Sequence, residues 1–168
     1  MKNRYFIISV FLISLAISFF VSCTEKQSSD AILEFVFDKD SQPENLIISN
    51  DGKTISAYNW NVGISDFYLV DGEVHIVSGI TVKNNSDSIQ QFKIVGKSQE
   101  DYESGLLSSA HLTAVNYDTQ SDIFEIQAFS QKTFRIVYIG KQGNYDKKHD
   151  RLAPDEISII IIDRAGQP

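Results

Sequence analysis

The chain has 168 residues, of which 42% are hydrophobic, and this suits one compact domain of roughly 100–150 residues. The formal net charge is -7, and loss of Lys2 and Arg4 with an N-terminal signal would leave 13 of the 15 basic residues against 22 acidic ones, or -9. Nucleic-acid binding requires clustered Lys and Arg side chains, so the composition argues against a nucleic-acid partner.

The first 22 residues have the three parts of an export signal. Lys2 and Arg4 form a positive start, an apolar run extends over 5–21, and the small residue Ser22 follows. The alternative is an uncleaved transmembrane anchor, because this run is only slightly shorter than the ~20 residues that span a bilayer. We favour the cleaved signal because of the residues that end it.

The segment Phe20-Val21-Ser22-Cys23 resembles the lipobox of bacterial lipoproteins, although Phe20 stands where that pattern usually has Leu. The resemblance implies cleavage between Ser22 and Cys23 and lipidation of Cys23, the only cysteine, with acyl chains such as palmitate. Two or three chains at ~0.8 kcal/mol per buried CH₂ would anchor a protein firmly. We therefore expect a signal peptide over 1–22, a lipidated cysteine and tether over 23–30, and a domain over 31–168. This domain would face outside the cytoplasm, anchored in the cell membrane or the outer membrane.

From residue 32 onward the apolar residues alternate with period two, which indicates strands with one buried face. Gly79 lies in the middle of the longest run, where we expect a β-bulge. Only 99–111 looks irregular, with room for one short helical turn. The expected strands are 33–37, 46–49, 54–60, 64–70, 73–83, 89–95, 112–115, 123–126, 133–139 and 157–162.

Many short strands separated by turns predict an all-β domain of the β-sandwich type. Ile80-Thr81-Val82-Lys83 enters the turn Asn84-Asn85-Ser86, and the later strands contain Phe92-Lys93-Ile94 and residues 133–139. These segments resemble the immunoglobulin-like (telokin-like) domains of small secreted bacterial lipoproteins, with Ser130-Gln131-Lys132 in place of the usual Pro-Gly turn. The resemblance implies an immunoglobulin-like β-sandwich in the cell envelope, with no catalytic residues to transfer.

The sequence contains no recognisable catalytic, metal or cofactor motif. His75, His111 and His149 lack the local spacing of zinc ligands. The segment 38–44 begins like a calcium loop, but Pro43 and Ser49 stand where that loop needs Gly and Glu, so a polar turn accounts for it better. Neither a Gly-x-Ser-x-Gly elbow nor a phosphate-binding loop is present. We therefore expect no catalytic residue, no metal and no cofactor.

Two segments are candidates for a ligand surface. Tyr58 and Trp60 alternate with asparagines, an arrangement found in sites that bind sugars or peptides. The alternative, which we favour, is that both rings fill the core, because aromatic residues are enriched in strands for packing. Glu100, Asp101 and Tyr102 lie in an acidic segment that could meet a basic partner or form a solvated loop.

The sequence therefore predicts a lipid-anchored, non-enzymatic module of the cell envelope that contacts a protein or peptide through strand edges and loops. One alternative is a small metal-dependent or hydrolytic enzyme with a site assembled from distant residues such as Asp101, His111 and His149. Another is a structural spacer in the envelope.

Overall fold

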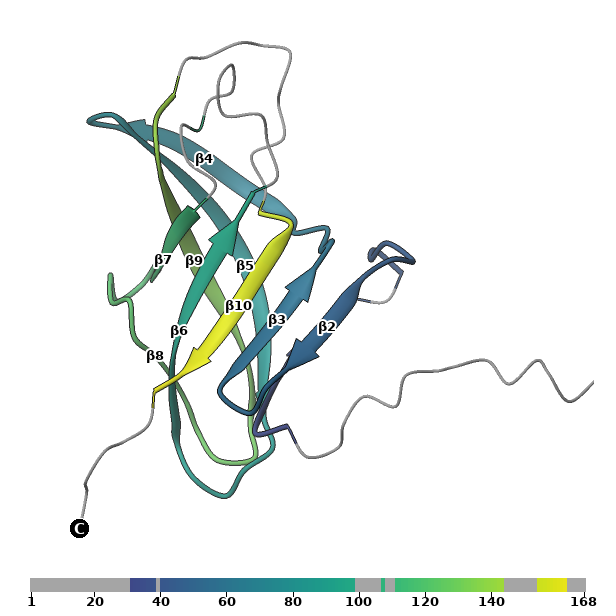
Figure 1. Ribbon diagram of the computed structural model, residues 1–168. Helices are drawn as coiled ribbons and strands as arrows, with labels where there is room; N and C mark the ends of the chain where they lie inside the picture. The colour runs from purple at the N-terminus through teal and green to yellow at the C-terminus, as the bar shows by residue number, and fades with distance from the viewer. Residues whose placement is uncertain (1–30, 39, 99–106, 108–110, 144–153, 163–168) are drawn as a thin grey trace, which may run out of the picture. The chain divides into compact units, whose positions relative to one another are not determined.

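A computed structural model describes residues 31–38, 40–98, 107, 111–143 and 154–162. The chain divides into two units, Met1–Asp30 and Ala31–Pro168, and all described residues belong to the second unit. This unit is all-β, and every strand pair in its described part is antiparallel (Figure 1). Within the same residues, no helix is long and apolar enough to span a membrane.

The ten strands expected from the sequence are confirmed, with boundaries that differ by two residues at most. They are β1 (Leu33–Val36), β2 (Ile47–Asn50), β3 (Thr54–Tyr58), β4 (Ile64–Val70), β5 (Glu73–Asn84), β6 (Gln90–Lys97), β7 (His111–Asn116), β8 (Phe124–Ile126), β9 (Gln131–Lys141) and β10 (Glu156–Ile161).

The strands form one curled sheet in the order β1-β5-β9-β7-β6-β10-β3-β2, with β4 added beside β5 and β8 beside β6. One edge of β5 pairs with β9, and the other edge pairs with β4 near its start and with β1 near its end. One half of the sheet contains β1, β4, β5 and β9, and the other contains β2, β3, β6, β8 and β10. β7 joins these two halves, because it pairs with both β6 and β9. β10, the last of the described strands, lies between β3 and β6 (Figure 1).

The core lies between the two halves of the sheet. Phe92 of β6, Phe124 of β8 and Phe134 of β9 are buried, and their ring centroids lie 5.5–5.6 Å apart. Burial of a side chain of this size is worth roughly 1.5–3 kcal/mol. Such packing accounts for a domain that lacks an internal disulfide.

The β-bulge expected at Gly79 is wrong. β5 pairs with β9 from Glu73 to Lys83 without a shift in register. Buried Ser78 continues the core face between Ile76 and Ile80, so the alternation passes Gly79 unbroken on the other face. The bulge lies instead in β4, where the register with β5 shifts between Ile64 and Asp66.

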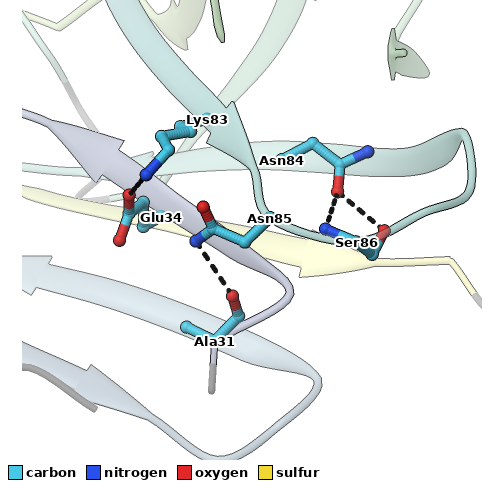
Figure 2. A network of polar contacts seen from close by, with 6 residues as sticks. All are labelled: Ala31, Glu34, Lys83, Asn84, Asn85 and Ser86. Carbon is cyan, nitrogen blue, oxygen red and sulfur yellow. Dashed lines mark hydrogen bonds and ion pairs between the residues drawn. The ribbon is translucent and has the colours of Figure 1, made fainter. Parts of the chain in front are cut away.

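The turn that follows β5 is organised by a buried amide. The side chain of Asn84 is fully buried, and its Nδ2 donates hydrogen bonds to the carbonyl oxygens of Ser88 at 2.8 Å and Gln127 at 3.0 Å. Its Oδ1 accepts hydrogen bonds from the backbone N–H of Ser86 at 2.9 Å and the Ser86 hydroxyl at 2.7 Å (Figure 2). Asn84 therefore holds the β5–β6 turn against the end of β8.

The neighbouring residues hold β1 against the same end of β5. Asn85 Nδ2 donates to the carbonyl oxygen of Ala31 at 3.2 Å, and Lys83 Nζ forms an ion pair with Glu34 Oε1 at 2.8 Å (Figure 2). The backbone N–H of Asn85 also donates to the carbonyl oxygen of Ile32 at 2.9 Å. The turn thus fixes the place where the described domain begins.

Candidate functional site

Most of the candidate residues from the sequence lie outside the described residues. They are Ser22, Cys23, Glu100, Asp101, Tyr102 and His149. Tyr58, Trp60, His75 and His111 are described, and each has a definite place in the sheet.

Trp60 is a core residue. It is 6% exposed, and its ring lies edge-on to Phe35 at 4.9 Å and to Phe37 at 4.8 Å between centroids. β3 ends at Tyr58, and Asn59 has a φ of 58°, so Tyr58 and Trp60 do not share one strand face. Trp60 therefore cannot belong to the candidate ligand surface, because packing against the aromatic rings of the core covers it. Tyr58 is half-buried on the face of β3 opposite the core residues Ile55 and Ala57, so the expectation that its ring also fills the core is wrong.

The two described histidines, His75 and His111, lie on strands that are separated by β9. His75 Nε2 lies 2.9 Å from Glu73 Oε2 on β5, and His111 begins β7. Among the described residues, no group of three or more His, Cys, Asp or Glu side chains could hold a metal ion. At the start of the segment considered for calcium, the Asp38 carboxylate accepts a hydrogen bond from the backbone N–H of Asp40 at 3.2 Å, as in a polar turn.

β4 is an apolar edge strand. It is the one described strand that is exposed at every position. Phe67 and Leu69, on the core side of the sheet, are 49% and 51% exposed, while Tyr68 and Val70 on the opposite side are 39% and 40% exposed. β5 covers one edge of β4, and no other described strand pairs with β4 (Figure 1).

Local sequence explains why β4 forms beside β5. Asp71 and Gly72 both have positive φ angles, 48° and 87°, which make the tight two-residue turn typical of β-hairpins. At the other end, the hydroxyl of Ser65 donates to the carbonyl oxygen of Val77 at 3.1 Å, and the hydroxyl of Ser78 donates to that of Gly63 at 2.6 Å. These contacts hold both ends of β4 on β5, so its other edge is presented as an extended strand.

The opposite end of the sheet offers a contrast. β2 is also an edge strand, because it pairs only with β3 among the described strands. It exposes one large apolar side chain, Ile47 at 53%, and continues with the polar pair Ser49 and Asn50. The apolar surface is therefore a specific property of β4.

A second candidate surface is a half-open cavity of about 340 Å³ on the outer face of β10, β6 and β7. We call it the β6 cavity. Its lining includes Val95, Lys97, His111, Thr113, Glu156 and Ser158. The register places Lys97 between His111 and Glu156, and Val95 between Thr113 and Ser158. Tyr58 lies beside Glu156 on the next strand, so it borders this surface.

The apolar edge of β4 and the β6 cavity differ in how far the sequence predicts them. The run 64–70 is recognisable as a strand, but four consecutive apolar residues suggest a strand covered on both sides, whereas β4 is exposed on both. The β6 cavity combines residues from three strands that meet only through register, and no local pattern marks them.

No family model, no curated protein and no solved structure matches this chain. The described unit is thus defined by its own geometry, an all-β domain with an apolar edge strand and a polar cavity on another part of the sheet.

Proposed function

We propose that this chain is a lipid-anchored, non-enzymatic interaction module of a bacterial cell envelope, and that it binds an extended segment of a protein partner along β4. The observation that carries the binding proposal is the exposed apolar edge of β4. The anchor rests on the export signal and on the likeness of residues 20–23 to a lipobox. Within this proposal the curled sheet is a variant of the immunoglobulin-like sandwich.

The side chains of β4 supply binding energy. Complete burial of a large apolar side chain is worth about 1.5–3 kcal/mol, so covering the exposed half of Phe67 or Leu69 contributes about 1 kcal/mol. Tyr68 and Val70 contribute in the same way on the other face, so a partner that wraps the edge gains more than one that covers a single face.

The backbone of β4 supplies direction. A partner that adds a strand to a sheet edge gains main-chain hydrogen bonds, and its alternate side chains fall on the two faces. Natural edge strands are often protected from such pairing by Lys, Pro or a β-bulge. The bulge of β4 is confined to its start, between Ile64 and Asp66, and residues 64–70 contain neither Lys nor Pro, with Asp66 as their only charged residue.

The charges near β4 indicate the chemistry of the partner. Asp66 and Asp71 are exposed near the two ends of the apolar stretch, and the chain as a whole is acidic. The favoured partner is therefore an extended segment with alternating apolar residues and flanking Lys or Arg, because like charge would repel an acidic segment.

Site-specific crosslinking in the cell envelope tests this proposal. A photoreactive amino acid replaces Leu69 in β4 or, as the matched control, Ile47 in β2, which are 51% and 53% exposed. We expect a discrete crosslinked product from position 69 and none from position 47. The crosslinked segment, once synthesised, should shift the amide resonances of β4, and Leu69→Lys should weaken its binding far more than Ile47→Lys. Equal products from both positions, or none from position 69, would contradict binding at β4.

The anchor is tested separately by mass spectrometry of the native N-terminus. We expect the chain to begin at Cys23 and to carry the added mass of acyl chains. An unmodified Cys23 or an intact Met1 would refute the anchor and leave the β4 proposal to its own experiment.

A further inference from the structure

We infer that the β6 cavity binds one sugar ring of a neutral carbohydrate through a pair of adjacent hydroxyl groups. Its volume of about 340 Å³ lies in the range of small-molecule sites, whose walls are largely apolar with a few placed polar groups. The cavity belongs to β6, β7 and β10, and β4 pairs with β5, so this inference does not rest on the proposed binding along β4.

The charges at the cavity favour a neutral ligand. Lys97 Nζ and Glu156 Oε2 lie 3.5 Å apart, and their side chains are 47% and 26% exposed. An ion or zwitterion would have to compete with this existing pair, whereas a hydroxyl group can accept from the ammonium and donate to the carboxylate at the same time. Two adjacent hydroxyls on one ring could each contact one member of the pair and leave it intact.

The serine and threonine side chains add a second row of polar groups. The hydroxyls of Ser158 and Ser56 lie 2.6 Å apart, and either can be the donor. Ser158 lines the cavity, so it offers a ligand its proton when Ser56 donates and an oxygen lone pair when Ser158 itself donates. Thr113 Oγ1 donates to the carbonyl oxygen of Ile139 at 3.4 Å and keeps lone pairs that can accept. The cavity thus offers both donors and acceptors, which suits sugar hydroxyls because each of them can donate and accept.

The apolar part of the cavity suits the carbon skeleton of a sugar. Val95 lies between Thr113 and Ser158 in the register and is 37% exposed, so it offers an apolar contact between two polar ones. Tyr58 lies beyond Glu156 and is half-buried, and its ring could extend the contact for a second sugar unit.

The test is an NMR titration of the full chain, held in a detergent that has no sugar headgroup. The probes are the methyl glycosides of glucose, galactose, mannose and N-acetylglucosamine, with acetate and methylammonium as charged comparisons. We expect at least one glycoside to cause saturable shifts at the amides of Val95, Lys97, Thr113 and Ser158, with a millimolar dissociation constant. Acetate and methylammonium should cause no saturable shift there.

Variants on β6 decide whether the binding is specific. Lys97→Met should weaken glycoside binding at least tenfold, or about 1.4 kcal/mol. Lys93→Met is the matched control, because Lys93 is also on the outer face of β6, is also 47% exposed and is paired with Asp122 rather than with Glu156. Its binding should match that of the parent. Absence of saturable shifts with all four glycosides, tighter binding of acetate or methylammonium, or equal losses in both variants would overturn the inference.

Discussion

Replacement of Asn84 by Ala tests whether the β5–β6 turn is a major source of stability. The side chain is fully buried and makes four hydrogen bonds, two as donor and two as acceptor. A hydrogen bond contributes a net 0.5–1.5 kcal/mol, and a buried group that loses its partner costs about 1–3 kcal/mol. Because water can reach part of the turn, we expect Asn84→Ala to lower the free energy of unfolding by about 3 kcal/mol.

Urea unfolding followed by circular dichroism measures this loss. A domain of this size should also melt roughly 10 °C lower, at about 3–4 °C for each kcal/mol. Asn85→Ala is the matched control, because it removes a single side-chain bond to the Ala31 carbonyl oxygen and leaves the backbone bond to Ile32. It should cost about 1 kcal/mol. A loss in Asn84→Ala that is no greater than in Asn85→Ala would refute the role assigned to the buried amide.

Three further predictions concern other parts of the domain. The Tyr138 hydroxyl is buried without a hydrogen-bond partner among the described residues, and burial raises its pKa well above the ordinary value of 10.0. Tyr138→Phe should therefore leave the free energy of unfolding unchanged or raise it by about 1 kcal/mol. The parent should also lose stability relative to the variant above pH 10, because the tyrosine ionises at a lower pH in the unfolded chain than in the folded one. A variant that is less stable than the parent in urea unfolding at neutral pH would contradict the predicted effect of Tyr138→Phe. Gly72→Ala should lower the free energy of unfolding by about 1–2 kcal/mol, because Gly72 has a φ of 87°. Gly63→Ala should be neutral or stabilising, because no atom lies near its added Cβ. Equal melting temperatures for the two variants would contradict the cost assigned to the positive φ of Gly72. Backbone N–H groups of Thr54 and Lys53 donate to the Asp51 carboxylate and lower its pKa below 3.8. The ionised carboxylate therefore stabilises the fold above that pH, and this stabilisation is lost on acidification. An NMR titration of the carboxyl group with a midpoint at or above 3.8 would disprove the lowered pKa.

The strands were predictable because alternation of apolar residues is a local property. In β5, Val74, Ile76, Ile80 and Val82 mark one buried face, and all four are buried in the structure. Gly79 misled the prediction because glycine in a strand often marks a bulge, but here it lies on the other face, where the nearest contact to an added Cβ would be the Thr133 methyl group at 3.9 Å.

The surfaces were not predictable because they depend on which strands become neighbours. Nothing local to 64–70 shows that β1 and β4 share one edge of β5 and that no described strand covers the other side of β4. The same holds for the β6 cavity, since Val95 meets Thr113 on one side and Ser158 on the other only after the sheet has formed. The pairing of β4 with β5, by contrast, has a local signal in the sequence. Asp71-Gly72 separates two apolar runs, and Asp-Gly at such a place is a strong signal for a hairpin.

The position of β10 has a consequence for the order of folding. The strand at the C-terminal end of the described domain pairs with β3, and the contact between Ser56 and Ser158 joins residues 102 positions apart. Pairings between such distant residues slow folding, because a long loop must close before they form. The sheet cannot be completed before residues 156–161 are in place, and a truncation before them would leave β3 and β6 with open edges that invite aggregation.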